Sequence, residues 1–309
     1  MRPHSTLQEM MLSLSSYWIE QGCVVHQPYD MEVGAGTMHP ETFFRSLGEE
    51  PWRVAYCQPS RRPADGRYAA NPMRVYKHFQ YQVILKPSPH DVQELYLDSL
   101  RAMGIRPEVH DVRFEEDNWE SPTLGAAGVG WQVAMDGMEI SQFTYFQSMG
   151  GQELKVIPVE LTYGMERICM FVNDVKDIFE LPWARAPWSA DGIVTYGDLR
   201  RLAEQQQSAY SFEEADIEQH RRWFEDCERD AVRLLDRTVD EHGEVKAAPL
   251  LVPAYERLLD ASHLFNVLDA RGALSVTERQ GMIQRIRRLS VRCARVWLSL
   301  RPGREAPAT

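Results

Sequence analysis

Two adjacent arginines end a strand-like run, in the sequence QPSRRP at residues 58–63. Arginine carries a permanent charge and fixed N–H donors, which suit phosphate oxygens. After a polar loop, a second strand-like run returns with Phe79, Gln80 and Gln82. We interpret this group as a nucleotide site, with phosphate on Arg61 and a base stacked on Phe79. The alternative is a solvated basic hairpin loop.

Another charged group lies where a strand runs through glycine into a helix, in the sequence TYGMER at residues 162–167. Arg167 falls near the predicted helix N-terminus, where the helix dipole disfavours a cation by roughly 0.3–1 kcal/mol. We infer that Arg167 interacts with a nearby anion. The simpler alternatives are a surface pair of Arg167 with Glu166 and, in the preceding loop, solvated charges on Arg62 and Arg74.

Glu139 and Glu160 fall on predicted strands rather than in loops. A carboxylate on a sheet face is costly unless it is paired with a cation or left in a wet cleft. With Gln142, Thr162 and Thr37 nearby in the pattern, these acids suit a ligand that carries an ammonium group. The alternative for each acid is an exposed strand face.

The elements that must position these residues are mainly strands. Strand patterns with turn signals between them are found at residues 52–58, 79–85, 131–135, 138–146 and 154–162. Asp136 and Gly137 separate two of these runs and give a strong hairpin signal. Neighbouring strands joined by short turns predict an antiparallel sheet. Trp119, in an acidic run, is interpreted as a packing aromatic that borders a polar cavity.

Beyond residues 182–187 the pattern is helical, with capping boxes predicted at Ser211 with Glu214 and at Ser275 with Glu278. The sequence therefore predicts an α+β fold in which an antiparallel-sheet catalytic domain is followed by a helical bundle. We place the first domain at residues 1–190 and the second at residues 191–309.

The chain has 45 acidic residues against 34 lysines and arginines, a net charge of −11. A protein that binds nucleic acid alone usually carries a basic surface, so we expect a partner to supply most of any such binding. The five cysteines are scattered without metal-site spacing, and we expect them to be reduced. Without an apolar run long enough to span a membrane and without a signal-peptide pattern, we expect a cytoplasmic protein.

The three chemical groups, in this order on an antiparallel sheet, resemble the three motifs of class II aminoacyl-tRNA synthetases. The local sequence is similar to that of glycyl-tRNA synthetase alpha subunits along nearly the whole chain. The runs that carry this resemblance lie at residues 34–37, 58–63, 114–120, 142–147, 162–167, 266–271 and 275–280.

The resemblance implies ATP-dependent activation of glycine and its transfer to tRNA(Gly), with Mg²⁺ assisting. It places Arg61 on the ATP α-phosphate, Arg167 on the γ-phosphate and Phe79 on adenine, with Gln80 and Gln82 in the same site. Glycine would be held by Glu160 and Thr162, supported by the residues Thr37, Trp119, Glu139 and Gln142. The metal ligands are left open.

The resemblance also implies a homodimer of this chain, with Pro28 near its interface, and a larger beta subunit in an α2β2 tetramer. A basic stretch between Arg271 and Arg304 gives one helix face that could meet this partner or tRNA; the alternative is a solvated face. Ala69 and Ala70 stand where the family usually has Gly-Glu. The competing hypotheses are a ligase that adenylates another small acid and a non-catalytic relative, but Arg61 and Arg167 are both present.

Overall fold

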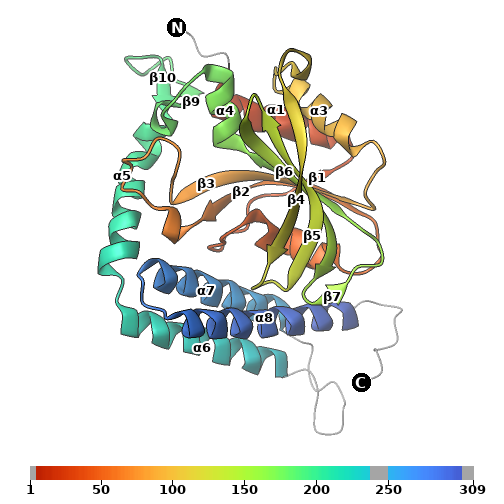
Figure 1. The fold of residues 1–309 in the computed structure, drawn as a ribbon, viewed down its shortest axis with the longest axis vertical. Coiled ribbons are helices and arrows are strands. Elements are labelled where there is room, and N and C mark those ends of the chain that lie inside the picture. Colours follow the sequence, from red (N-terminus) through yellow and green to blue (C-terminus); the bar gives the residue numbers. More distant parts are fainter. Residues whose placement is uncertain (1–4, 237–249, 301–309) are drawn as a thin grey trace.

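The computed structural model describes residues 5–236 and 250–300, and its centre is one eight-stranded sheet (Figure 1). The strands lie in the order β1, β2, β3, β8, β6, β5, β4, and β7 pairs with β6. Only β1 with β2 is a parallel pair within the described part of this sheet, so the predicted antiparallel sheet is confirmed. The bounds are β1 (Val24–Val25), β2 (Trp52–Arg61), β3 (Lys77–Lys86), β4 (Val112–Ser121), β5 (Ala126–Met135), β6 (Met138–Met149), β7 (Gln152–Glu153) and β8 (Val159–Gly164).

The predicted hairpins are present, and two of the strand predictions need correction. Asp136 and Gly137 join β5 to β6 with φ of 49° and 82°, the left-handed pair that a two-residue turn requires. The run predicted as a strand from residue 154 forms β8 only from Val159 onward. Strand β4 was not predicted. Its side chains largely alternate between half-buried and exposed positions, and because many of them are charged, this alternation does not appear as an apolar and polar pattern in the sequence.

Helices cover both faces of the sheet (Figure 1). The apolar side chains of α1, α3 and α4 form one core with the side chains of the sheet face that they cover. The opposite face packs on α2, α6, α7 and α8 through a second core. The helices are α1 (Leu7–Glu20), α2 (Pro40–Ser46), α3 (Val92–Ala102), α4 (Met165–Asn173), α5 (Tyr196–Ala209), α6 (Ile217–Asp236), α7 (Leu251–Ala270) and α8 (Val276–Ser299).

Shorter elements connect these layers. A small hairpin of β9 (Pro182–Arg185) and β10 (Ile193–Thr195) precedes α5, and α5 continues into a π-helix, η5 (Tyr210–Glu214). The remaining short turns are 3-10 helices: η1 (Gly36–Met38), η2 (Pro63–Asp65), η3 (Pro107–Val109) and η4 (Ile178–Glu180).

The predicted helical bundle is formed by α6, α7 and α8, below the sheet in Figure 1. The capping box of Ser275 and Glu278 opens α8, as expected. The box predicted at residues 211–214 is wrong, because these residues form η5, while the Asp216 side chain accepts from the Gln219 amide (2.7 Å) at the start of α6. The domain boundary at residue 190 stays a prediction.

Candidate active site

Polar side chains lie in a row across one face of the central strands. Side chains alternate between faces along a strand, so Gln80 and Gln82 of β3 share one face. The register pairs Gln82 with Thr162 of β8 and Thr162 with Gln142 of β6. The Thr162 hydroxyl donates to Gln82 Oε1 at 2.6 Å. The sheet therefore brings together four of the residues that the sequence assigned to two substrates.

A buried cluster of Glu160, Thr37 and Gln82 adjoins this row, and we call this cluster the buried pocket. Glu160 is only 2% exposed, and the Thr37 hydroxyl lies 2.9 and 3.0 Å from its two carboxylate oxygens. Burial raises the pKa of Glu160 to about 7, against which the hydrogen bond from Thr37 acts. A cationic ligand would offset the cost of the buried charge and favour the ionised carboxylate.

The turn that carries Thr37 lies close to the polar row. The Gly36 amide donates to Gln80 Oε1 at 2.8 Å, and the Tyr56 hydroxyl donates to the Gly36 carbonyl at 2.9 Å. A Cβ atom at Gly36 would lie 2.4 Å from the Gln82 side chain, so only glycine fits at this approach. The glycine run of the sequence thus holds Thr37 over Glu160.

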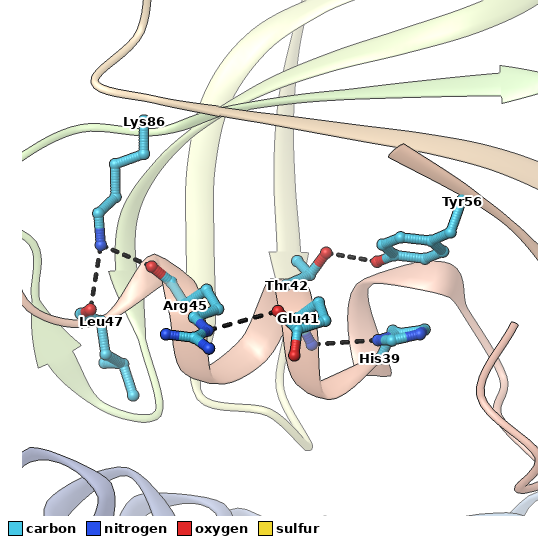
Figure 2. Close-up of polar contacts among 7 residues, drawn as sticks. All are labelled: His39, Glu41, Thr42, Arg45, Leu47, Tyr56 and Lys86. Atoms are coloured by element: carbon cyan, nitrogen blue, oxygen red, sulfur yellow. Dashed lines mark hydrogen bonds and ion pairs between the residues drawn. The ribbon is translucent and has the colours of Figure 1, made fainter. Parts of the chain in front are cut away.

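Helix α2 follows this turn and is fixed at both ends (Figure 2). Near its start, the Thr42 and Tyr56 hydroxyls share a hydrogen bond. At its C-terminus the buried Lys86 ammonium donates to the carbonyls of Arg45 (2.5 Å) and Leu47 (3.0 Å). A cation on the last carbonyls of a helix satisfies unpaired acceptors and complements the dipole. These contacts hold the Thr37 turn to the sheet.

A cavity of about 340 Å³ opens beside the pocket, and we call it the basic cavity after the arginines Arg62, Arg74 and Arg167 that line it. Arg167, near the start of α4, reaches Glu139 of β6, with Nη1 2.9 Å from the carboxylate and 3.2 Å from the backbone carbonyl. The cavity is lined by Arg62, Asp65, Met73, Arg74, Val75, His78, Gln80, Glu139, Ile140, Ser141, Gln142, Thr162, Gly164, Glu166, Arg167, Met170 and Ile178.

The arginines of this cavity could bind an anion, although Asp65, Glu139 and Glu166 balance their charges in the lining. Burial, and then the charges of Arg62 and Arg167, lower the pKa of His78 to about 3, so its ring is neutral at pH 7. Desolvation also lowers the pKa of Arg62, with Arg167 contributing, but a guanidinium stays charged. A phosphate between these arginines would relieve their repulsion.

The structure separates the predicted residues into groups. Gln80, Glu139, Gln142, Thr162 and Arg167 line the cavity. Thr37, Glu160 and Gln82 form the buried pocket next to it.

Arg61 lies elsewhere. It pairs with Glu32 and hydrogen-bonds to the Tyr76 side chain, at a second cavity of about 520 Å³ that Trp223 also lines. Its neighbour Arg62 is the arginine that reaches the basic cavity. Sequence reasoning treated Arg62 as a solvated charge.

Phe79 and Trp119 are also outside the described cavity lining. Phe79 packs with the first core on the face opposite Gln80, and its ring centroid lies 5.4 Å from that of Trp183. Trp119 packs against Phe146, with 5.4 Å between ring centroids. The adenine role of Phe79 stays a prediction without support from this geometry. His78, which the sequence reasoning missed, shares the face of Gln80, and counting back by two would have found it.

Among the described residues, no group of three or more His, Cys, Asp or Glu side chains could hold a metal ion by itself. In residues 5–236 and 250–300 no helix is long and apolar enough to cross a membrane.

Comparison with known proteins points to one family. The family model described as "Glycyl-tRNA synthetase alpha subunit" matches residues 7–302. The glycine–tRNA ligase alpha subunit of Coprothermobacter proteolyticus is 54% identical over 302 residues, covering 98% of each chain. Two solved structures of pyrrolysyl-tRNA synthetase from Desulfitobacterium hafniense match at TM-scores of 0.42 and 0.40, with 15% and 16% identity. They cover 60% of this chain and 72% and 75% of their own, and at these scores they carry no weight for the site.

Proposed function

This chain belongs to the glycyl-tRNA synthetase alpha subunit family, and from that premise we propose that the cavity and the buried pocket together form glycyl adenylate. Members of the family are class II ligases that join glycine to tRNA with ATP. One observation carries the assignment of the site: a basic cavity and a buried carboxylate pocket adjoin on the same sheet face. ATP and glycine bring the complementary charges, polyphosphate and ammonium.

In the first step a glycine carboxylate oxygen attacks the α-phosphorus of ATP, and pyrophosphate leaves. The tRNA terminal hydroxyl then attacks the carbonyl carbon of the adenylate, so that an ester forms and AMP leaves. Neither step needs a protein nucleophile, because orientation and charge stabilisation supply the rate enhancement. We assign Arg167 and Arg62 to the phosphates, since both line the basic cavity. Arg61, which the family resemblance favours, is the competing candidate for the α-phosphate.

Glycine would enter the buried pocket with its ammonium group toward Glu160. Thr37 orients that carboxylate, while Thr162 and Gln82 supply neighbouring polar atoms. The close approach of the Gly36 turn leaves little room beside these groups, which favours a substrate without a side chain. Gln142 and Glu139 line the basic cavity and would lie between the bound glycine and the phosphates.

The donor set fits a magnesium ion that arrives with the nucleotide. Mg²⁺ is usually held by one or two carboxylates together with substrate phosphates and water. Glu139 lines the basic cavity and offers carboxylate oxygens of this kind. When bound, the ion would neutralise charge on the phosphates.

The partners proposed are tRNA(Gly), a beta subunit and a second copy of this chain in an α2β2 assembly, in the cytoplasm. Part of the basic C-terminal stretch is already neutralised, because Arg279, Arg285 and Arg292 pair with Asp269, Glu228 and Asp236. Arg287, Arg288 and Arg295 are exposed on α8. Arg301 and Arg304 lie outside the described residues. This modest basic surface supports a need for the beta subunit in tRNA recognition.

Exchange of pyrophosphate into ATP tests the proposal. The purified chain, with and without its beta subunit, should catalyse exchange with glycine and not with the other standard amino acids. Efficient charging of tRNA should require the beta subunit. Exchange driven by a different small acid would favour the adenylating-ligase alternative, and absence of exchange in the complete complex would favour a non-catalytic relative.

A further inference from the structure

The first residues of β3 pair with β2, but on the side of β8 a helix takes the place of a neighbouring strand. In the described residues, β3 pairs with β8 only from Gln80 onward. Before that point the Glu204 side chain of α5 takes the place of a strand. Its carboxylate accepts from the amides of Tyr76 (2.6 Å) and Lys77 (3.0 Å). Glu204 is 1% exposed, so water does not compete for these bonds.

A second bond joins the same helix to the loop between β2 and β3. The Ser208 hydroxyl, fully buried one turn after Glu204, accepts from the Tyr68 amide at 2.9 Å. The loop lies so close that a Cβ atom at Gly66 would be 2.7 Å from Ser208 Oγ and 3.2 Å from the Phe212 ring. The Tyr68 hydroxyl also donates to Glu213 of η5.

This loop adopts a conformation that needs outside support. Tyr68 and Ala69 have φ of 54° and 57°, the left-handed region that costs L-residues roughly 1–2 kcal/mol each. Two such residues in succession persist only when the surroundings fix them. Tyr68, the first residue of the strained pair, makes both of these bonds, its amide to Ser208 and its hydroxyl to Glu213, and they supply that fixation.

The same loop forms a wall of the basic cavity. Residues 62–76 contribute Arg62, Asp65, Met73, Arg74 and Val75 to the lining, and β3 adds His78 and Gln80 directly after the residues that Glu204 holds. A shift of the loop on α5 would therefore move the arginine assigned to phosphate. Catalysis is sensitive to displacements of about 1 Å in such groups.

We propose that α5 and η5 set the conformation of the ATP-binding wall, with Glu204 and Ser208 as positioning residues for ATP. The inference rests on the proposed function, since it takes the basic cavity to be the ATP site. It links the helical part of the chain to the nucleotide. The residues Glu204 and Ser208 of α5 act through the β2–β3 loop and the start of β3, while Tyr196 at the start of α5 also hydrogen-bonds to Glu166 of the cavity lining (3.3 Å).

Two substitutions test the inference in the full-length chain. Glu204→Gln replaces one acceptor oxygen by an NH₂ group, which cannot accept from a backbone amide. Ser208→Ala removes one acceptor and little volume. Leaving a buried amide unsatisfied costs about 1–3 kcal/mol, so we expect the KM for ATP in glycine-dependent exchange to rise about tenfold for Glu204→Gln. Ser208→Ala should give roughly a threefold rise, because water can reach the loop more easily.

The KM for glycine should change by less than about twofold in both variants, because the buried pocket does not contact α5 through these residues. Hydrogen exchange should accelerate at the amides of Tyr76 and Lys77 in Glu204→Gln and at that of Tyr68 in Ser208→Ala. Gln205→Ala, at an exposed position of α5, is the matched control and should leave both KM values unchanged.

Equal rises in both KM values would reduce Glu204 and Ser208 to a general role in stability and overturn the inference. An unchanged KM for ATP, with faster amide exchange, would show that the loop moves without affecting ATP and would also overturn it. If Glu204→Gln does not fold, Ser208→Ala decides. Absence of glycine-dependent exchange in the unmodified complex would instead contradict the proposed function.

Discussion

The basic cavity and the buried pocket lie next to each other, yet their charged side chains differ in exposure and in ionisation near neutral pH. Arg167 in the basic cavity keeps almost half of its side chain exposed, whereas Glu160 in the buried pocket is 2% exposed. Desolvation acts against the charged form of Glu160. Arginine stays ionised because its pKa is so high, whereas burial raises the pKa of Glu160 to about 7.

The difference teaches that only one half of the proposed site is permanently charged. The arginines of the phosphate side stay charged at any pH near neutrality. The glycine side should acquire its charge as the pH rises or as the substrate ammonium enters. Variants that remove a charge from one side should therefore differ from variants of the other side in the size of the kinetic effect, in the substrate whose KM changes and in the pH dependence.

The largest effect is expected on the phosphate side. Arg167→Ala and Arg62→Ala each remove a charge that faces the basic cavity, and we expect glycine-dependent exchange to fall about a hundredfold or more. Arg61→Ala should have a smaller effect, since Arg61 is paired with Glu32 outside this cavity. The measurement is kcat/KM for ATP in pyrophosphate exchange.

Arg101→Ala is the control for loss of an exposed arginine, because Arg101 pairs with Asp98 and Glu108 on the far side of the sheet. If Arg61→Ala proves more damaging than Arg62→Ala in folded proteins, the assignment by resemblance is right and the assignment by geometry is wrong.

A smaller and more selective effect is expected on the glycine side. Glu160→Gln keeps the shape of the side chain and removes the charge that would face the ammonium. A hydrogen bond to a charged group contributes about 1.5–3 kcal/mol, so the KM for glycine should rise about tenfold to a hundredfold. The KM for ATP should stay within a factor of about two, as measured in the same exchange assay. A matching rise in both constants would remove Glu160 from the glycine pocket.

Titration of Glu160 should also appear in the unmodified enzyme. The pKa of its carboxyl is raised to about 7 by burial, so the proton is bound below that pH and the negative charge is lost. Glycine affinity should therefore weaken as the pH falls from 8 to 6, by at most about tenfold per pH unit. ATP affinity should not follow the same curve.

Glu166 complicates this test because burial raises its pKa to about 7 as well. It accepts from the Phe79 amide at 2.8 Å and also borders the basic cavity. Glu160→Gln separates the two carboxyls: glycine affinity should lose its pH dependence in this variant. A dependence that persists unchanged would assign the titration to Glu166 or another group.

The sequence was sufficient for the sheet, the main hairpins and the polar row, because local alternation and turn residues encode them. It could not decide between neighbouring residues, and the roles given to Arg61 and Phe79 stay predictions. Arg61 and Arg62, like Phe79 and Gln80, have the same local context, and only the pleat decides which side chain reaches the cavity. The Arg61 and Phe79 predictions combined residues from both faces into one site.

Local sequence patterns could not predict the long-range contacts. Glu204 lies in a helical pattern 128 residues after the amide of Tyr76 that it accepts from, and nothing near either residue indicates the other. The burial that shifts the pKa of Glu160 also depends on a turn 123 residues away, through Thr37. A single sequence gives the donors and acceptors but not their pairing.

The smallest predicted effect separates stability from chemistry on the phosphate side. Ala69 has φ of 57°, a conformation that disfavours L-residues and that glycine adopts freely, and the family resemblance leads one to expect glycine there. Ala69→Gly should relieve roughly 1–2 kcal/mol of strain and lose about 0.5–1 kcal/mol through the greater entropy of the unfolded chain. The free energy of unfolding should therefore rise by up to about 1.5 kcal/mol, as measured by denaturant titration. Ala70→Gly is the neighbouring control: Ala70 is outside the left-handed region, so glycine brings only the entropic loss and should destabilise the protein. The KM for glycine should be unchanged in both variants, because Tyr68 and Ala69 adjoin the wall of the basic cavity and glycine is assigned to the buried pocket. Equal destabilisation by the two substitutions would mean that Ala69 is not strained and that α5 has no strained loop to hold.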